Sequence, residues 1–152
     1  MTNENNGEIK GDMPKLEATR IYGYSPYDIE QMREVPLTLN RDDFIVFLNS
    51  IADKYPFMVI MGLRVLKEIT VKEILKQEGI PYNEKKDTLS PLLIKLRDKK
   101  VISEGMYNSL NGLVKLENTA AHGYEISVDW ARLALNTIPD NLNDLRKVAN
   151  QI

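Results

Sequence analysis

Apolar side chains recur at helical spacing along most of the chain after residue 40. Positions three, four and seven apart repeat as apolar, which is the pattern of a helix that buries one face. The spacing predicts five helices, at about residues 41–52, 57–77, 88–99, 103–121 and from 127 to about 148. Strand-like alternation does not appear. The pattern therefore predicts an all-α fold, a bundle of four to five mainly antiparallel helices.

Polar residues and glycines mark where these helices begin and end. Asn40 and Ser103 are good N-caps, since a short polar side chain can accept from the free N–H groups of a first turn. Gly79 and Gly123 are expected to end the second and fourth helices. Pro139 interrupts the last stripe without shifting its phase, which predicts one kinked helix or two nearly collinear ones.

The first 40 residues lack this periodicity. Residues 1–15 are polar and are expected to form a disordered tail. Residues 16–40 are expected to form an irregular, tyrosine-rich arm with one short helix at about 27–33. Its tyrosines, Tyr22, Tyr24 and Tyr27, favour packing on the bundle, although such rings can also stack bases. The bundle itself is expected to span residues 41–152.

Composition narrows the classes of protein. A chain of 152 residues suits one main core, and the absence of cysteine excludes disulfides and thiolate metal sites. The most apolar stretch, residues 56–66, is too short to cross a bilayer and contains Arg64. No phosphate-binding glycine loop or metal-ligand cluster appears, so no cofactor is expected. A cytoplasmic protein without a membrane segment fits these features.

Net charge is −2, so the chain lacks the overall basic field of many nucleic-acid-binding proteins. One dense run of cations, Lys95 to Lys100, lies near the end of the third predicted helix. Cations are favoured at that end of a helix. A solvated helix end is therefore the preferred interpretation, ahead of an RNA-binding patch.

His122 is the sole histidine and the first candidate for chemistry. On a helix it shares a face with Asn118, one turn earlier, and with Lys115. An imidazole titrates near neutral pH, an amide can hold or orient a group, and a cation stabilises a phosphate. Cleavage of RNA without a metal needs such groups. The alternative is structural, because a histidine before a helix-ending glycine can interact with the last carbonyls.

The segment Glu117–Gly123 (ENTAAHG), followed by a final amphipathic helix, resembles small prokaryotic HEPN-like domains, which show a Gly-Asn-x-Ala-Ala-His run. The upstream segment from Leu63 to Ile80 is similar to the opening helix of that group. The resemblance implies a helical bundle and a homodimer. In active members of the superfamily it also implies a metal-independent ribonuclease, with an arginine a few residues before the histidine.

The sequence departs from that motif at the arginine. Glu117 and Leu116 stand at two of the permitted positions, and Lys115 is a cation at the edge of the spacing. Lysine lacks the bidentate fork of arginine. Arg64 is the other candidate phosphate ligand. It lies in the most apolar helix, with Glu68 four residues later, so a structural ion pair is the alternative interpretation.

Three hypotheses follow. The first is a non-catalytic HEPN-like module that dimerises and binds a protein partner or RNA in a defence or mobile-element setting. The second is a metal-independent ribonuclease that uses His122 with Asn118, Lys115 or Arg64. The third is a plain structural bundle whose resemblance is accidental.

Overall fold

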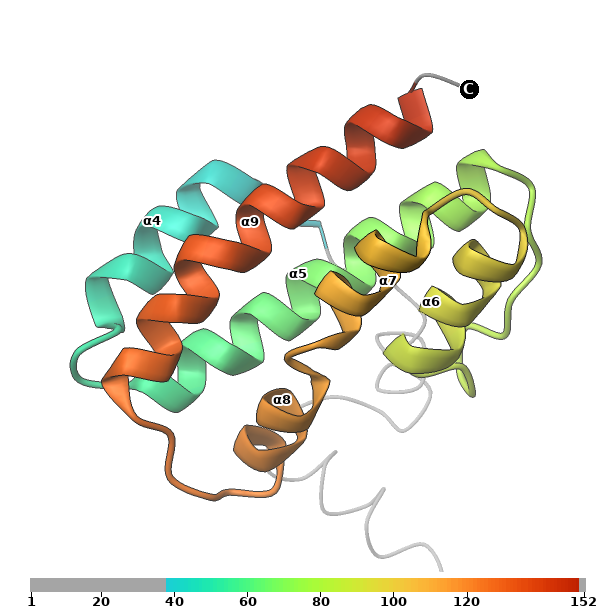
Figure 1. Ribbon diagram of the computed structural model, residues 1–152. Helices are drawn as coiled ribbons and strands as arrows, with labels where there is room; N and C mark the ends of the chain where they lie inside the picture. Colours follow the sequence, from blue (N-terminus) through green and yellow to red (C-terminus); the bar gives the residue numbers. More distant parts are fainter. Residues whose placement is uncertain (1–37, 151–152) are drawn as a thin grey trace, which may run out of the picture. The chain divides into compact units, whose positions relative to one another are not determined.

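The computed structural model describes residues 38–150, which form six helices and contain no strand. In chain order they are α4 (Arg41–Ile51), α5 (Pro56–Gln77), α6 (Leu89–Asp98), α7 (Glu104–Asn111), α8 (Val114–Ala121) and α9 (Val128–Asn150) (Figure 1). The predicted all-α bundle is confirmed. The predicted tail, tyrosine-rich arm and short helix at 27–33 lie outside the described residues.

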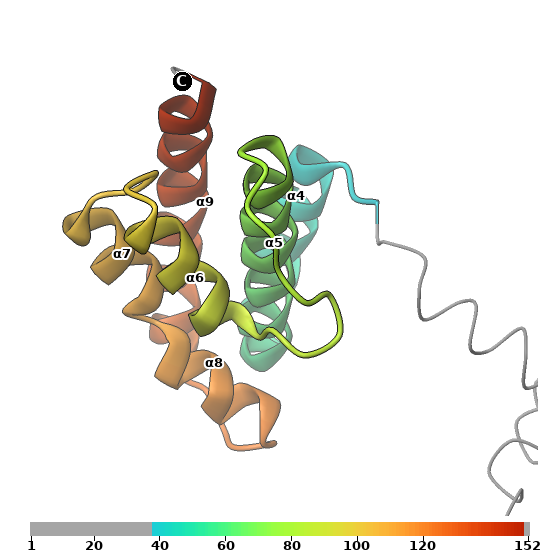
Figure 2. The ribbon, with the colours of Figure 1, turned by 90° about the vertical axis from the view of Figure 1, so that its right-hand side faces the viewer.

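Helix α5 is the centre of the bundle. It packs against α4 on one side and against α6, α8 and α9 on others (Figure 2). An apolar stripe runs along its whole length and supplies the core with Val59, Ile60, Leu63, Leu66, Val71, Ile74 and Leu75. Because its neighbours cover it from several sides, α5 needs a wider apolar face than a surface helix.

The two longest helices, α5 and α9, run parallel, which departs from the mainly antiparallel arrangement expected from sequence (Figure 1). Arg132, near the start of α9, donates to Asp53 just before α5 at 2.8 Å, and Arg146, near the end of α9, donates to Thr70 at 3.4 Å. The three short helices α6, α7 and α8 carry the chain back from the end of α5. As a result α9 begins beside the beginning of α5.

A glycine lets α4 lie close to α5. A Cβ atom on Gly62 would stand 2.9 Å from Leu48 Cδ2 and 3.0 Å from Phe44 Cζ. Such contacts are tighter than van der Waals packing allows. The small residue therefore sets the distance between these two helices.

Most of the predicted helix ends are confirmed. The side chains of Asn40 and Ser103 each accept from a first-turn N–H at 3.1 Å. Gly79 and Gly123 end their helices with positive φ angles of 68° and 81°, a conformation that costs glycine little. Pro139 lies inside α9, which continues through it as one helix.

The prediction of one helix over residues 103–121 is wrong. The chain breaks at Gly112 and Leu113, so α7 and α8 are separate and the bundle has six described helices rather than four or five. Glycine lowers the cost of leaving the helix there. At the break the carbonyl of Leu110 accepts from Lys67 Nζ at 2.7 Å. A contact from α5 therefore holds the end of α7 where the stripe alone indicates continuity.

None of the helices in residues 38–150 is long and apolar enough to cross a membrane.

Candidate functional site

A buried ion pair joins α5 to α8. Lys67 Nζ lies 2.6 Å from Glu117 Oε2, and each side chain is only 1% exposed. Lys67 also donates to the Leu110 carbonyl, so one ammonium group ties together α5, α7 and α8. Sequence reasoning missed this pair. The sequence could have indicated that Lys67 is buried, because it lies among Leu63, Val71 and Ile74 on the apolar stripe of α5.

Burial governs the titration of both groups. It lowers the pKa of Lys67 and raises the pKa of Glu117, while their mutual attraction acts in the opposite direction on each. Glu117 Oε2 lies against the Lys67 ammonium without a well-oriented hydrogen bond, and the buried Oε1 has no hydrogen-bond partner within the described residues. Such an atom normally finds a partner in a protein, a water or a ligand.

A cavity of about 160 Å³ lies beside this carboxylate. Three helices line it: α5 with Arg64, the start of α6 with Thr88, Leu89 and Ser90, and α8 with Val114, Glu117 and Asn118. The lining of the cavity combines two aliphatic side chains with a guanidinium, an amide, two hydroxyls and a carboxylate. The polar groups come from segments far apart in sequence.

Two of the four residues predicted from sequence meet at this cavity. Arg64 Nη1 donates to Asn118 Oδ1 at 3.2 Å, and Arg64 Nε lies 3.8 Å from Glu68 Oε1. The Arg64 side chain is about one quarter exposed. The predicted Arg64–Glu68 pair therefore exists, at a distance that indicates a weak interaction, and Arg64 also binds the amide predicted for the site.

The other two predicted residues lie elsewhere. His122 is the C-cap of α8, and its N–H donates to the Asn118 carbonyl at 3.0 Å. The side chains of His122 and Lys115 are exposed, and neither has a hydrogen bond or ion pair within the described residues. Neither lines the cavity beside Glu117.

The departure from the ribonuclease motif has a structural counterpart. Glu117, which stands at one permitted position of the motif arginine, faces the core and pairs with Lys67. A side chain at this position is therefore buried, whereas His122 lies at the exposed end of α8. An arginine introduced there would place its charge beside Lys67.

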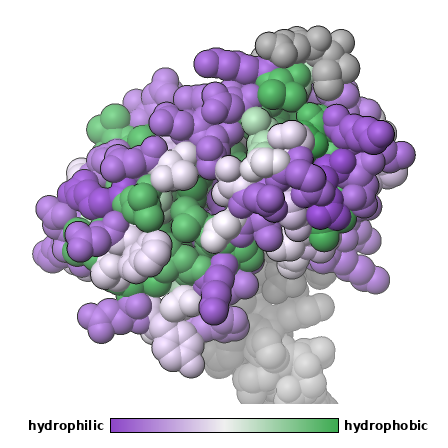
Figure 3. All heavy atoms as spheres, viewed as in Figure 1, coloured by the Kyte–Doolittle hydropathy of each residue, from purple (hydrophilic) through white to green (hydrophobic). Residues whose placement is uncertain are grey.

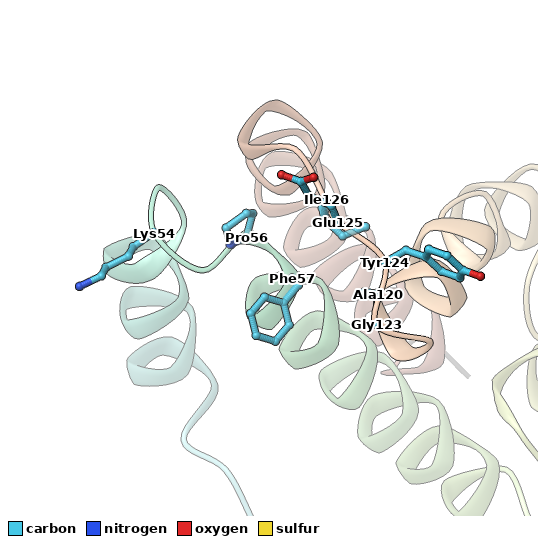
Figure 4. A pocket seen from close by; sticks show the side chains of 8 residues that line it. All are labelled: Lys54, Pro56, Phe57, Ala120, Gly123, Tyr124, Glu125 and Ile126. Carbon is cyan, nitrogen blue, oxygen red and sulfur yellow. The ribbon is translucent and has the colours of Figure 1, made fainter.

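A second, larger cavity opens where the α4–α5 turn approaches the α8–α9 loop. Its volume is about 530 Å³, and Figure 4 shows the residues that line it: Lys54, Pro56, Phe57, Ala120, Gly123, Tyr124, Glu125 and Ile126. Phe57 is 46% exposed and Tyr124 68%. Tyr55 and Met58, beside Phe57 in sequence, are also exposed. Figure 3 shows hydrophobic residues gathered over the first half of α5.

Comparison of the chain with protein-family models, with curated proteins and with solved structures finds no match. Within residues 38–150, no group of three or more acidic or histidine side chains could hold a metal ion.

Proposed function

We propose that this bundle is a non-catalytic HEPN-like binding module that forms a homodimer through the surface around Phe57 and Tyr124. The supporting observation is the exposed aromatic cavity of about 530 Å³ at the α4–α5 turn. Large apolar side chains that gather on a surface commonly mark an interaction site, because their hydration is unfavourable.

The charges at this cavity favour a second copy as the occupant. Lys54 and Glu125 both line it, and Figure 4 shows Lys54 just before α5 and Glu125 in the loop that leads to α9. Neither side chain forms an ion pair within the described residues, and Lys54 Nζ lies 5.5 Å from the centre of the Tyr55 ring. In a two-fold interface the same surface meets itself, so an axis that passes between these two residues would set Lys54 of each copy against Glu125 of the other. Such an arrangement would make the surface self-complementary.

Charge reversal tests this arrangement. Sedimentation equilibrium of the full chain should show a dimer for wild type and a weaker one for Lys54→Glu or Glu125→Lys alone. The double variant Lys54→Glu/Glu125→Lys should recover the dimer, because the cross-interface pairs form again with opposite signs. Lys115→Glu, which changes charge on another surface, is the matched control. A monomeric wild type, or a double variant no better than the singles, would count against the proposal.

The ribonuclease remains the second candidate because Arg64 binds Asn118, one helical turn before His122. A cation and an amide are then both near the end of α8, as metal-independent cleavage would need. Mixed RNA incubated with EDTA distinguishes the two functions. The binding module predicts no cleavage by wild type or by His122→Ala, whereas cleavage by wild type alone would establish the enzyme.

A further inference from the structure

The cavity beside Glu117 has hydrogen-bond donors along one wall, at the N-terminal end of α6. Thr88, Leu89 and Ser90 are the N-cap and the first two residues of this ten-residue helix. The Thr88 side chain makes no capping hydrogen bond, so no side chain caps the N–H groups of the first turn. This end of a helix carries a partial positive charge and attracts anions.

A cation faces those donors from another wall. Arg64 uses one N–H for Asn118 and has others available, since a guanidinium carries five. Asn118 accepts through its oxygen, which leaves its amide NH₂ group as a further donor. Arginine is suited to planar, bidentate recognition of oxyanions. The helix end and Arg64 together favour a negatively charged oxygen group.

One group in the cavity, the Glu117 carboxylate, needs a hydrogen-bond donor and not an anion. Glu117 Oε1 accepts no hydrogen bond, and its side chain is 1% exposed. An anion that offers only lone pairs would leave this oxygen unsatisfied and repelled. A ligand that brings its own O–H or N–H would instead donate to it.

We propose that this cavity binds a small oxyanion that carries a hydrogen-bond donor, with phosphate in its protonated form as the simplest member. The volume of about 160 Å³ is roughly that of five water molecules, which is room for such an ion. A phosphodiester has no proton to donate, so this site is distinct from any surface that holds an RNA backbone. Short hydroxy acids offer the same combination of anion and donor.

Titration calorimetry of the full chain at pH 7 tests the donor requirement with matched pairs of anions. Phosphate retains at least one P–OH at this pH, whereas sulfate of nearly equal size has none. We expect phosphate to bind at least tenfold more tightly than sulfate, or glycolate at least tenfold more tightly than acetate. The phosphate pair and the hydroxy-acid pair distinguish the two sources of the ligand. Equal affinities within both pairs, or no binding, would overturn the proposal.

Substitutions of Arg64 and Glu117 test whether the anion binds in this cavity. Arg64→Ala should weaken binding of the preferred anion at least tenfold, and Lys147→Ala, which removes an exposed cation on α9, should leave that binding unchanged. Binding that survives Arg64→Ala would indicate an adventitious ion only. Glu117→Gln should remove the discrimination against sulfate, since an amide can donate. Circular dichroism checks its folding, and the Arg64 variant and the anion pairs decide the question if Glu117→Gln unfolds.

Discussion

At the scale of single residues, the chain buries a different cation from the one that the sequence drew attention to. Arg64 was recognisable as a charge in an apolar helix, but it lies near the edge of the stripe and keeps part of its surface in water. Lys67 lies closer to the centre of the stripe and is fully covered. Sequence periodicity could have placed Lys67 inside, but not its partner, because Glu117 is 50 residues away.

A buried ion pair need not stabilise a fold, but losing one partner is costly. Lys67→Met or Glu117→Leu should each lower the free energy of unfolding by about 3–5 kcal/mol, because one charge is left buried alone. The double variant should be more stable than either single variant. Its recovery should be incomplete, since the Leu110 carbonyl also loses its donor. Urea denaturation measures all four proteins of this cycle.

The exposed pair of Arg132 and Asp53, at 2.8 Å, provides the comparison. Arg132→Met should cost less than about 1 kcal/mol, because water already solvates both charges. The opposite outcome is a double variant that loses as much free energy of unfolding as the Lys67→Met and Glu117→Leu variants lose together. That result would mean that the two buried groups act independently, contrary to their contact.

At the scale of helices, local signals could be predicted and tertiary ones could not. The caps at Asn40 and Ser103 and the glycine ends at Gly79 and Gly123 depend on neighbouring residues alone, and they are confirmed. The break between α7 and α8 depends on α5, since Lys67 holds the Leu110 carbonyl. The apolar periodicity of residues 103–121 cannot reveal this contact with α5.

One helix end uses a residue that is poorly suited to it. Lys100 has a positive φ of 59° just after α6, and two 2.9 Å hydrogen bonds, from its N–H to Arg97 O and from Val101 N–H to Leu96 O, close the helix. A side chain in this conformation costs about 1–2 kcal/mol. Lys100→Gly should therefore raise the free energy of unfolding by about 1 kcal/mol.

The neighbouring lysine is the control for that change. Lys99 has a φ of −83°, so Lys99→Gly relieves no strain and should lower stability by roughly 0.5–1 kcal/mol. Both variants remove one exposed positive charge from the same helix end. Equal changes in the urea midpoint would show that charge, and not backbone conformation, controls stability there.

At the scale of the whole molecule, the fold class could be predicted because helical periodicity recurs throughout the bundle. The path of the chain could not be predicted in this way. Helices α5 and α9 run parallel because the three short helices between them lead the chain back across the bundle. The candidate site shares this limit. Asn118 was found from its local motif and Arg64 from its unusual surroundings. The cavity that they share with Thr88 and Ser90 exists only once three helices have met.

The buried apolar core described in residues 38–150 extends from Leu48 to Ala149 and is continuous across the bundle. Residues 39–152 also form a compact unit of their own. A chain that begins at residue 38 should therefore keep its helical circular dichroism and unfold in one cooperative urea transition. Because Lys54, Phe57, Tyr124 and Glu125 are all retained, it should also dimerise like the full chain.

That comparison separates folding from assembly. The loss of a cooperative transition would mean that residues before 38 complete the core, and the domain boundary predicted near residue 40 would be wrong. A cooperative but monomeric bundle would mean that those residues supply the interface. The surface at the α4–α5 turn would then require another occupant. Matching transitions and matching dimer affinities would assign both the fold and the contact to residues 38–152.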